Sequence, residues 1–212
     1  MEAAADAGVR RLVISSTIGT MYMNPHRDPD APLDEWSWSD LALQEDRGKL
    51  RSDLFFTPKI HPPSKEMASD ARWNPQNWYC YAKTIAEQSA WQAARARGLD
   101  LAVVIPVVVL GELMQPSMNT SNLHILKYLT GQAKDYVNES HAYVNVKDAA
   151  EAHVRVLEAP GAGGHRYVCA ERTLHRGELC RILAQLFPEY PIPTRYGDAL
   201  LTDSWNWCYS GA

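Results

Sequence analysis

Two short apolar runs, separated by one long stretch of helical periodicity, dominate the pattern of hydrophobic and polar positions. The first run, residues 12–16, ends in hydroxyl side chains followed by a glycine turn, and the second, residues 101–111, contains Pro106. Short apolar runs bounded by turn residues are typical of buried strands. Between them the periodicity predicts a helix over residues 75–97. We expect its small-residue stripe, which includes Ala82 and Ala86, to pack on the sheet and Glu87 to lie on the solvent side. A strand, a helix and a strand in this order predict an α/β fold whose two strands are parallel.

The remaining segments predict shorter elements around this centre. Residues 2–8 are typical of the last turns of a helix ended by glycine. Beyond residue 110 we expect the chain to leave the sheet and form a separate lobe. The elements predicted there are a helix over 119–129, a strand over 141–146, a helix over 147–158, a strand over 167–170 and a helix over 176–187.

Composition and charge limit the classes of protein that fit this pattern. The 212 residues are 46% hydrophobic and 22% charged with a net charge of −4, which is ordinary for a globular protein and argues against general nucleic-acid binding. The four cysteines are widely spaced and form neither a metal-site pattern nor a disulfide framework. The longest apolar run is too short to span a bilayer, and the first ten residues lack a signal-peptide pattern. We therefore predict a cytoplasmic protein without a metal site.

One pair of side chains on the predicted central helix suggests chemistry. Tyr79 and Lys83 are four residues apart, so they lie on one face of the helix, about one turn from each other. A neighbouring ammonium group favours the phenolate over the phenol, and a tyrosine in that setting can act as a general acid or base. By itself the pair is a weak signal, because exposed helices often carry such a spacing by chance.

The context of this pair resembles a known family. The heptapeptide 77–83, Asn-Trp-Tyr-Cys-Tyr-Ala-Lys, resembles the signature of plant cinnamoyl-CoA reductases, members of the extended short-chain dehydrogenase/reductase family, with Ala82 in place of the usual glycine. Four further segments resemble the same family in the same order, and together they cover most of residues 9–195: 22–25, 33–40, 124–131 and 174–178.

The resemblance implies a fold and a division of the chain. The fold would be the C-terminal half of a doubly wound Rossmann-type parallel sheet with a small substrate lobe. Residues 1–110 would form a partial NAD(P)-binding domain, residues 111–195 the substrate-binding lobe and residues 196–212 a divergent tail. The glycine-rich turn that binds the cofactor pyrophosphate is not found, because the glycine cluster 161–164 precedes a strand rather than a helix. We therefore expect a chain truncated at its N-terminus.

The resemblance also implies a reaction, the NADPH-dependent reduction of a hydroxycinnamoyl-CoA thioester to an aldehyde in the phenylpropanoid pathway of lignin. Tyr79 would protonate the carbonyl oxygen, and Lys83 would favour the phenolate and hold the nicotinamide ribose. Thr17 would orient the carbonyl, with Ser16 as the alternative hydroxyl. Ser16, Tyr79, Lys83 and Pro106 would face the NADP(H) cofactor. The competing interpretation of the two hydroxyls is that they cap a turn.

Three further residues match the family's proposed coenzyme A signature. His124, Lys127 and Arg176 would bind the phosphates of that ligand, since basic side chains suit phosphate groups. The alternative is three solvated surface residues. A ketone reductase resembling dihydroflavonol reductases would need Tyr79 and Lys83 but not these three. A catalytically inactive chain that binds an intact relative is a further alternative.

Residues 42–76 depart from the family pattern. They are longer than the corresponding family segment, carry a charged run over 44–49 and contain three prolines between 57 and 64, a composition typical of linkers. We predict an insertion without a packed core, which could be retained non-coding sequence or a true loop. Together with the truncation, it leads us to expect that this chain alone is poorly soluble and does not measurably reduce feruloyl-CoA.

Overall fold

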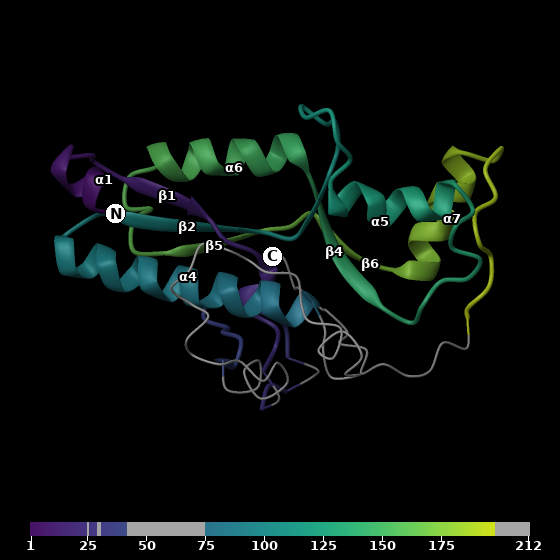
Figure 1. Cartoon of the computed structure of the whole chain (residues 1–212), viewed down its shortest axis with the longest axis horizontal. Helices are drawn as coiled ribbons and strands as arrows, with labels where there is room; N and C mark the ends of the chain where they lie inside the picture. Colours follow the sequence, from purple (N-terminus) through teal and green to yellow (C-terminus); the bar gives the residue numbers. More distant parts are fainter. Residues whose placement is uncertain (25, 29–30, 42–74, 198–212) are drawn as a thin grey trace, which may run out of the picture.

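The computed structural model describes residues 1–24, 26–28, 31–41 and 75–197, which form two sheets flanked by helices (Figure 1). The first sheet contains β1 (Leu12–Ser15), β2 (Leu101–Pro106) and β5 (Arg166–Cys169) in the order β1-β2-β5. All neighbouring pairs are parallel, and Ser15 lies opposite Val104 in the register of β1 and β2. The predicted parallel pairing of the first two strands is confirmed.

Two helices cover opposite faces of this first sheet: α4 (Pro75–Arg97) and α6 (Val146–Glu158) (Figure 1). Alternate side chains along each strand point to opposite faces. The α4 face holds the largest apolar cluster, which includes Val103, Ile105 and Ala94. The α6 face holds a smaller cluster in which Val104 packs with Val156. The sheet is thus buried on both sides, as the continuous apolar runs predict.

The second sheet is smaller and of mixed direction. It contains β3 (Val108–Leu110), β4 (Ser140–Asn145) and β6 (Arg172–His175), with β3 parallel and β6 antiparallel to β4. Two helices, α5 (Thr120–Leu129) and α7 (Arg176–Leu186), lie beside it (Figure 1). An apolar cluster unites these elements; its buried members are Tyr128, Tyr143, Leu179, Cys180 and Leu183.

The apolar run 101–111 is divided between the two sheets, which corrects the prediction of a single strand. Pro106 ends β2, and the chain then enters β3, which pairs with β4 instead. Proline has no N–H group and cannot donate to a sheet ladder, so it suits the point where a strand changes partners. The chain also returns to the first sheet at β5, inside the range that we assigned to the lobe. The division into three regions stays a prediction.

The buried face of α4 differs from the small-residue stripe that the sequence suggests. Ala82 and Ala86 are exposed, whereas Cys80, Thr84 and Glu87 are buried. We expected Glu87 on the solvent side, but its side chain is only 1% exposed. Residues spaced by three or four positions share a helical face. More than one face of α4 shows this spacing, so the pattern alone did not identify the face that is buried.

Glu87 is buried because a buried arginine pairs with it. Arg166 Nε donates to Glu87 Oε1 over 2.7 Å, and Arg166 Nη2 donates to the hydroxyl of Thr20 over 3.0 Å. Its Nη1 donates to the backbone carbonyls of Glu35 (3.0 Å) and Ser37 (2.7 Å). This network joins α4, β5 and the loop 33–40, and it satisfies the charge that burial would otherwise penalise.

The other helices and the strands β4 and β5 begin and end within a few residues of their predicted positions, whereas no strand was predicted at β6. The chain starts with α1 (Glu2–Asp6), and a 3-10 turn, η1 (Ile18–Thr20), follows β1. The predicted insertion over residues 42–76 and tail over 196–212 lie largely outside the described residues. Among the described helices, none combines the length and apolarity needed to cross a bilayer. In the same residues no group of three or more potential metal ligands comes together.

Candidate active site

The predicted catalytic residues gather at the carboxyl end of the first sheet. β1 ends at Ser15, and β2 ends at Pro106, two positions beyond the residue opposite Ser15. Thr17 follows β1 by two residues and therefore lies near the same end. In open parallel α/β sheets this end is where ligands bind.

The N-terminal part of α4 brings Tyr79 and Lys83 to this end of the sheet. Lys83 Nζ donates to the backbone carbonyl of Ser15 over 3.1 Å, so the ammonium group is held against the end of β1. Tyr79, one helical turn earlier, is 53% exposed. The arrangement offers a solvent-accessible phenol beside a fixed cation, as a general acid or base would require.

Thr17 begins the η1 turn that packs against α4. Its Oγ1 accepts from the N–H of Gly19 over 3.4 Å, so the turn-capping role that we considered is present. Gly19 lies so close to α4 that a Cβ on it would approach Cys80 Sγ to 2.6 Å. The turn containing Thr17 therefore touches the residue that follows Tyr79. A hydroxyl that accepts one hydrogen bond can still donate another, and the catalytic role of Thr17 stays a prediction.

Ser16 points away from Ser15 and into the protein. Its side chain is buried, and its hydroxyl donates to the Glu87 carboxylate. Neighbouring residues of a strand face opposite sides of the sheet, which explains the different surroundings of Ser15 and Ser16. The contact with Glu87 favours Thr17 over Ser16 as the substrate-orienting hydroxyl. A cofactor contact by Ser16 stays a prediction.

The sequence did not single out the pairing of Ser15 with α6. Ser15 Oγ lies 2.6 Å from His153 Nε2, and the other ring nitrogen of His153 lies 2.6 Å from the carbonyl oxygen of Ala149. In the sequence, Ser15 is one of the hydroxyls that end a predicted strand, and His153 is one residue of a predicted helix. No local pattern links positions that are 138 residues apart.

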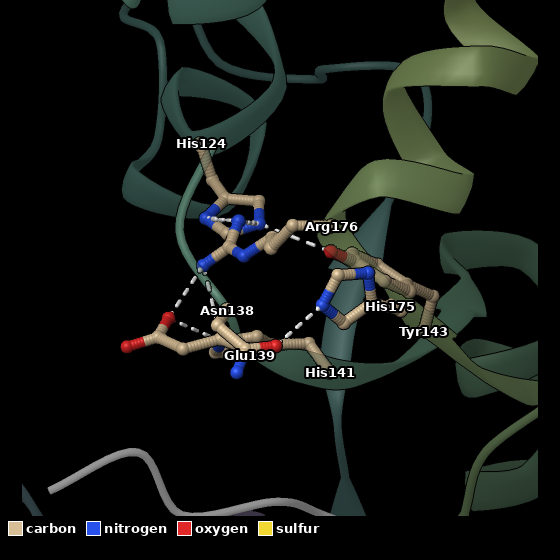
Figure 2. A network of polar contacts seen from close by, with 7 residues as sticks. All are labelled: His124, Asn138, Glu139, His141, Tyr143, His175 and Arg176. Carbon is tan, nitrogen blue, oxygen red and sulfur yellow. Dashed lines mark hydrogen bonds and ion pairs between the residues drawn. The ribbon is translucent and has the colours of Figure 1, made fainter. Parts of the chain in front are cut away.

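A second polar cluster lies in the lobe and contains His124 and Arg176, two of the three predicted coenzyme A residues (Figure 2). His124 and Lys127 come from α5, and Arg176 is the first residue of α7. Arg176 is only 4% exposed, so it is not the solvated residue of the alternative interpretation. Its Nη1 lies 2.9 Å from His124 Nδ1 and also contacts His124 Nε2.

Two residues that the sequence analysis missed complete this cluster. Arg176 Nη2 lies 3.0 Å from His141 Nε2 and 3.4 Å from Glu139 Oε2 (Figure 2). Glu139 and His141 flank Ser140, the first residue of β4. Alternate residues of an extended chain point the same way, so the carboxylate and the imidazole lie on the same side. That alternation was visible in the sequence and could have indicated partners for a buried arginine. Arg176 Nε has no hydrogen-bond partner among the described residues.

The protonation states in the cluster follow from these contacts. A guanidinium group only donates, so the ring of His124 receives Arg176 Nη1 through the lone pair of one ring nitrogen. Burial, with Arg176 adding to it, lowers the pKa of His124 to about 3, so this imidazole is neutral near pH 7. The hydrogen bond with His141 is the main cause that lowers the pKa of Glu139 to about 2 and keeps it ionised. The positive charge therefore resides on Arg176 and not on His124.

Lys127 provides a second cation at the edge of this cluster. Its Nζ lies 5.0 Å from the centre of the Tyr128 ring. Partial burial, together with repulsion from Arg176, lowers the pKa of Lys127 below its ordinary value. Each cation disfavours the charge of the other, and an anion placed between them would relieve that repulsion.

Comparison with known proteins gives one family match and several close relatives. Residues 50–170 match the model of the NAD dependent epimerase/dehydratase family. Over 198 residues, 93% of this chain, the sequence is 49% identical to cinnamoyl-CoA reductase 1 of Arabidopsis thaliana and 48% identical to cinnamoyl-CoA reductase 1 of Petunia hybrida. The aligned part covers 49% and 51% of those proteins, so the chain spans about half the length of the curated relatives it matches.

Solved structures share the fold at lower identity. Vestitone reductase from alfalfa (Medicago sativa) superposes with a TM-score of 0.67 at 22% identity, over 99% of this chain and 63% of that one. The yeast methylglyoxal/isovaleraldehyde reductase Gre2, solved with NADPH, gives a TM-score of 0.67 at 22% identity, over 93% and 55% of the two chains. The Rossmann-type α/β fold predicted from the sequence is confirmed.

Proposed function

The chain belongs to the NAD dependent epimerase/dehydratase family, and we propose that the carboxyl end of its first sheet is the catalytic end of a cinnamoyl-CoA reductase-type site. The observation that carries the proposal is the hydrogen bond from Lys83 to Ser15 beside the exposed phenol of Tyr79. The 49% identity to a curated cinnamoyl-CoA reductase supports a thioester as the substrate.

The residues at this end fit the nicotinamide part of NADP(H). Lys83 offers ammonium hydrogens beyond the one bound to Ser15, which suits the hydroxyls of a ribose. Pro106 lies at the end of the central strand, where its missing N–H leaves space and no unpaired donor. Bound NADPH would supply a hydride to the carbonyl carbon of the thioester.

The reaction needs a proton at the carbonyl oxygen, and the described residues can provide it. Tyr79 would donate its phenolic proton as the oxygen gains negative charge, and Lys83 would stabilise the phenolate that remains. Thr17 would donate a hydrogen bond to the same oxygen and orient it. The resulting hemithioacetal expels coenzyme A and leaves a hydroxycinnamaldehyde.

The cluster in the lobe would bind the phosphates of the coenzyme A part. Arg176 and Lys127 supply the charge. Among the described residues Arg176 Nε has no hydrogen-bond partner, so this donor is available for an anion. His124, being neutral, would hold Arg176 in place and would not attract phosphate itself. We place the reaction in the cytosol, where the free thiols of Cys80, Cys169 and Cys180 would stay reduced.

Calorimetric titration of the 212-residue chain with coenzyme A, and with its analogue lacking the 3′-phosphate, tests the substrate part of the proposal. We expect coenzyme A to bind more tightly than the analogue, with the difference reduced by Lys127→Gln. Absence of coenzyme A binding would instead favour a ketone reductase of the dihydroflavonol reductase type, which has no use for these cations.

Kinetics with feruloyl-CoA and NADPH test the catalytic part. In a preparation that turns over this thioester, Tyr79→Phe should lower kcat by a factor of about 100 or more, the usual contribution of a general acid. Tyr190→Phe, which also alters an exposed tyrosine, should leave kcat unchanged. Full activity of the Tyr79→Phe variant would exclude the assignment.

A further inference from the structure

Ser15 connects the two helices that cover opposite faces of the first sheet. Its backbone carbonyl accepts a hydrogen bond from Lys83 of α4 over 3.1 Å. Its hydroxyl lies 2.6 Å from Nε2 of His153 in α6. A single residue at the end of β1 therefore contacts the proposed catalytic lysine through its main chain and a histidine through its side chain.

The direction of the hydrogen bonds around His153 follows from the partners. The carbonyl oxygen of Ala149, 2.6 Å from Nδ1, can only accept, so Nδ1 carries a hydrogen. In the neutral ring Nε2 is then the acceptor, and the hydroxyl of Ser15 donates to it. Both ring nitrogens are thereby engaged, which fixes the orientation of the imidazole and of the Ser15 side chain.

The backbone of Ser15 needs such support because its carbonyl is outside the β1-β2 ladder. Leu12 donates its N–H group to the carbonyl of Asp100, just before β2, and Ser16 donates to that of Val104, so the alternate residues 12, 14 and 16 are those that face β2. The carbonyl of Ser15 points to the other side, where it meets Lys83. Its position thus depends on contacts other than the strand pairing.

We propose that His153 and Ser15 form a positioning pair for Lys83, in which the hydrogen bond from α6 holds the carbonyl that receives the lysine ammonium. The inference rests on the proposed function for the role of Lys83 in the reaction. His153 does not touch the reacting atoms in this scheme; it acts through Ser15. When the pair is broken, the ammonium group loses a fixed acceptor and becomes free to move relative to Tyr79.

The competing explanation is that His153 only attaches α6 to the sheet. Apolar contacts already do this, because Val156 and Ala152 of α6 pack with Val13 and Val104 of the sheet. Ser15, by contrast, is exposed, so its bond with His153 adds little buried surface. The two explanations differ in what happens at Lys83, and that difference can be measured.

Amine labelling of the folded 212-residue chain, followed by mass spectrometry, reports on Lys83 directly. In the variants Ser15→Ala and His153→Leu we expect the acetylation rate of Lys83 to rise about fivefold, as for the loss of one hydrogen bond. The double variant should show no further rise, since both changes remove the same contact. Lys127, Lys134 and Lys147 in the same sample should keep their rates and serve as internal standards.

Two further variants separate positioning from a general effect on α6. Arg155→Ala breaks an exposed pair with Glu151 on the same helix and should leave the labelling of Lys83 unchanged. His153→Gln places an amide near the position of Nε2 and should restore most of the protection. If His153→Leu fails to fold, Ser15→Ala and His153→Gln still decide the matter. Unchanged labelling of Lys83 in Ser15→Ala would overturn the proposal.

Turnover of feruloyl-CoA gives the functional counterpart. If the proposed reaction is correct, Ser15→Ala should lower kcat several-fold and leave KM for the thioester unchanged, because only the catalytic lysine is displaced. In a preparation that turns over the thioester, faster labelling of Lys83 beside an unchanged kcat in Ser15→Ala would refute the proposed role of Lys83 in the reaction and keep the positioning pair. Unchanged labelling beside full activity would refute the pair alone.

Discussion

Among the described residues two arginines are buried, Arg166 in β5 of the first sheet and Arg176 at the start of α7, and they have very different partners. Arg166 donates to a fully buried carboxylate, a hydroxyl and two backbone carbonyls, and it lies 3.8 Å from the centre of the Trp38 ring. Arg176 faces two imidazoles and, at 3.4 Å, a carboxylate that is 31% exposed.

The difference indicates two different roles. Each guanidinium nitrogen of Arg166 donates to a group of the protein, so this side chain joins the elements around it. Arg176 keeps a buried Nε without a partner among the described residues, and its other two guanidinium nitrogens contact imidazole nitrogens. A buried donor left unsatisfied costs free energy, which a bound anion would recover. Arg166 is therefore a structural residue, and Arg176 is the better candidate for a ligand contact.

The largest expected effect is on stability around Arg166. Glu87→Gln keeps the shape of the side chain but removes the charge that balances a buried guanidinium, so it should cost about 3–5 kcal/mol of unfolding free energy. Urea denaturation measures this loss. Glu151→Gln, which removes a carboxylate from an exposed pair with Arg155, should change stability little. Equal effects of the two variants would contradict a structural role for the buried pair.

The second expected effect is a pH dependence that belongs to the lobe. The folded-state pKa of His124 is about 3, below its ordinary value of 6.5, so between these pH values the unfolded chain binds more protons than the folded one. Stability should therefore fall as the pH drops through this window, with a slope of up to about 1.4 kcal/mol per pH unit. Glu139, with a folded-state pKa of about 2 instead of 4.5, adds to the fall only at lower pH.

His124→Asn separates these contributions. The variant keeps a neutral acceptor near Arg176 and removes the titrating ring, so the slope between pH 6.5 and 4.5 should decrease. Burial also lowers the pKa of His141, which accounts for the part of the slope that remains. Urea denaturation at several pH values gives the comparison, and an unchanged slope in His124→Asn would show that this histidine is not buried as a neutral base.

A third effect concerns ligand binding and should distinguish the two arginines most clearly. Arg176→Met should weaken coenzyme A binding about tenfold or more, as expected for a lost hydrogen bond to a charged group. Arg181→Gln removes an exposed charge from the same helix and should leave the affinity unchanged. Calorimetry measures both. Coenzyme A binding that survives Arg176→Met in a folded variant would assign Arg176 a structural role as well.

The smallest expected effect involves the ring beside Arg166. Trp38→Leu removes the aromatic face from the guanidinium and should lower stability by about 1–2 kcal/mol, the range for a desolvated cation–π contact. Trp36→Leu alters a neighbouring tryptophan that is 83% exposed and should have almost no effect. Thermal unfolding of the two variants side by side tests whether Trp38 is part of the network around Arg166.

Sequence reasoning predicted the candidate site unevenly. It placed Tyr79 and Lys83 on one helix and assigned His124, Lys127 and Arg176 to one ligand site, because family motifs and helical spacing are local properties. It did not foresee Glu139 and His141 as partners of Arg176, or His153 as the partner of Ser15. It also expected Glu87 in solvent, since a carboxylate on a helix gives no sign of burial unless its partner is known.

The sequence by itself determined the strand, helix and strand at the centre of the fold, the parallel pairing of β1 with β2 and the family, but neither the division of residues 101–111 into two strands nor β6. Apolar periodicity and motifs act over a few residues, so they can be followed along the chain. Only the tertiary structure decided which polar groups meet. Ser16 and Glu87 are 71 residues apart, Glu87 and Arg166 are 79 apart, and Ser15 and His153 are 138 apart. Such contacts depend on how the sheets bring distant segments together, and a polar residue carries the same local pattern whether it is paired or solvated.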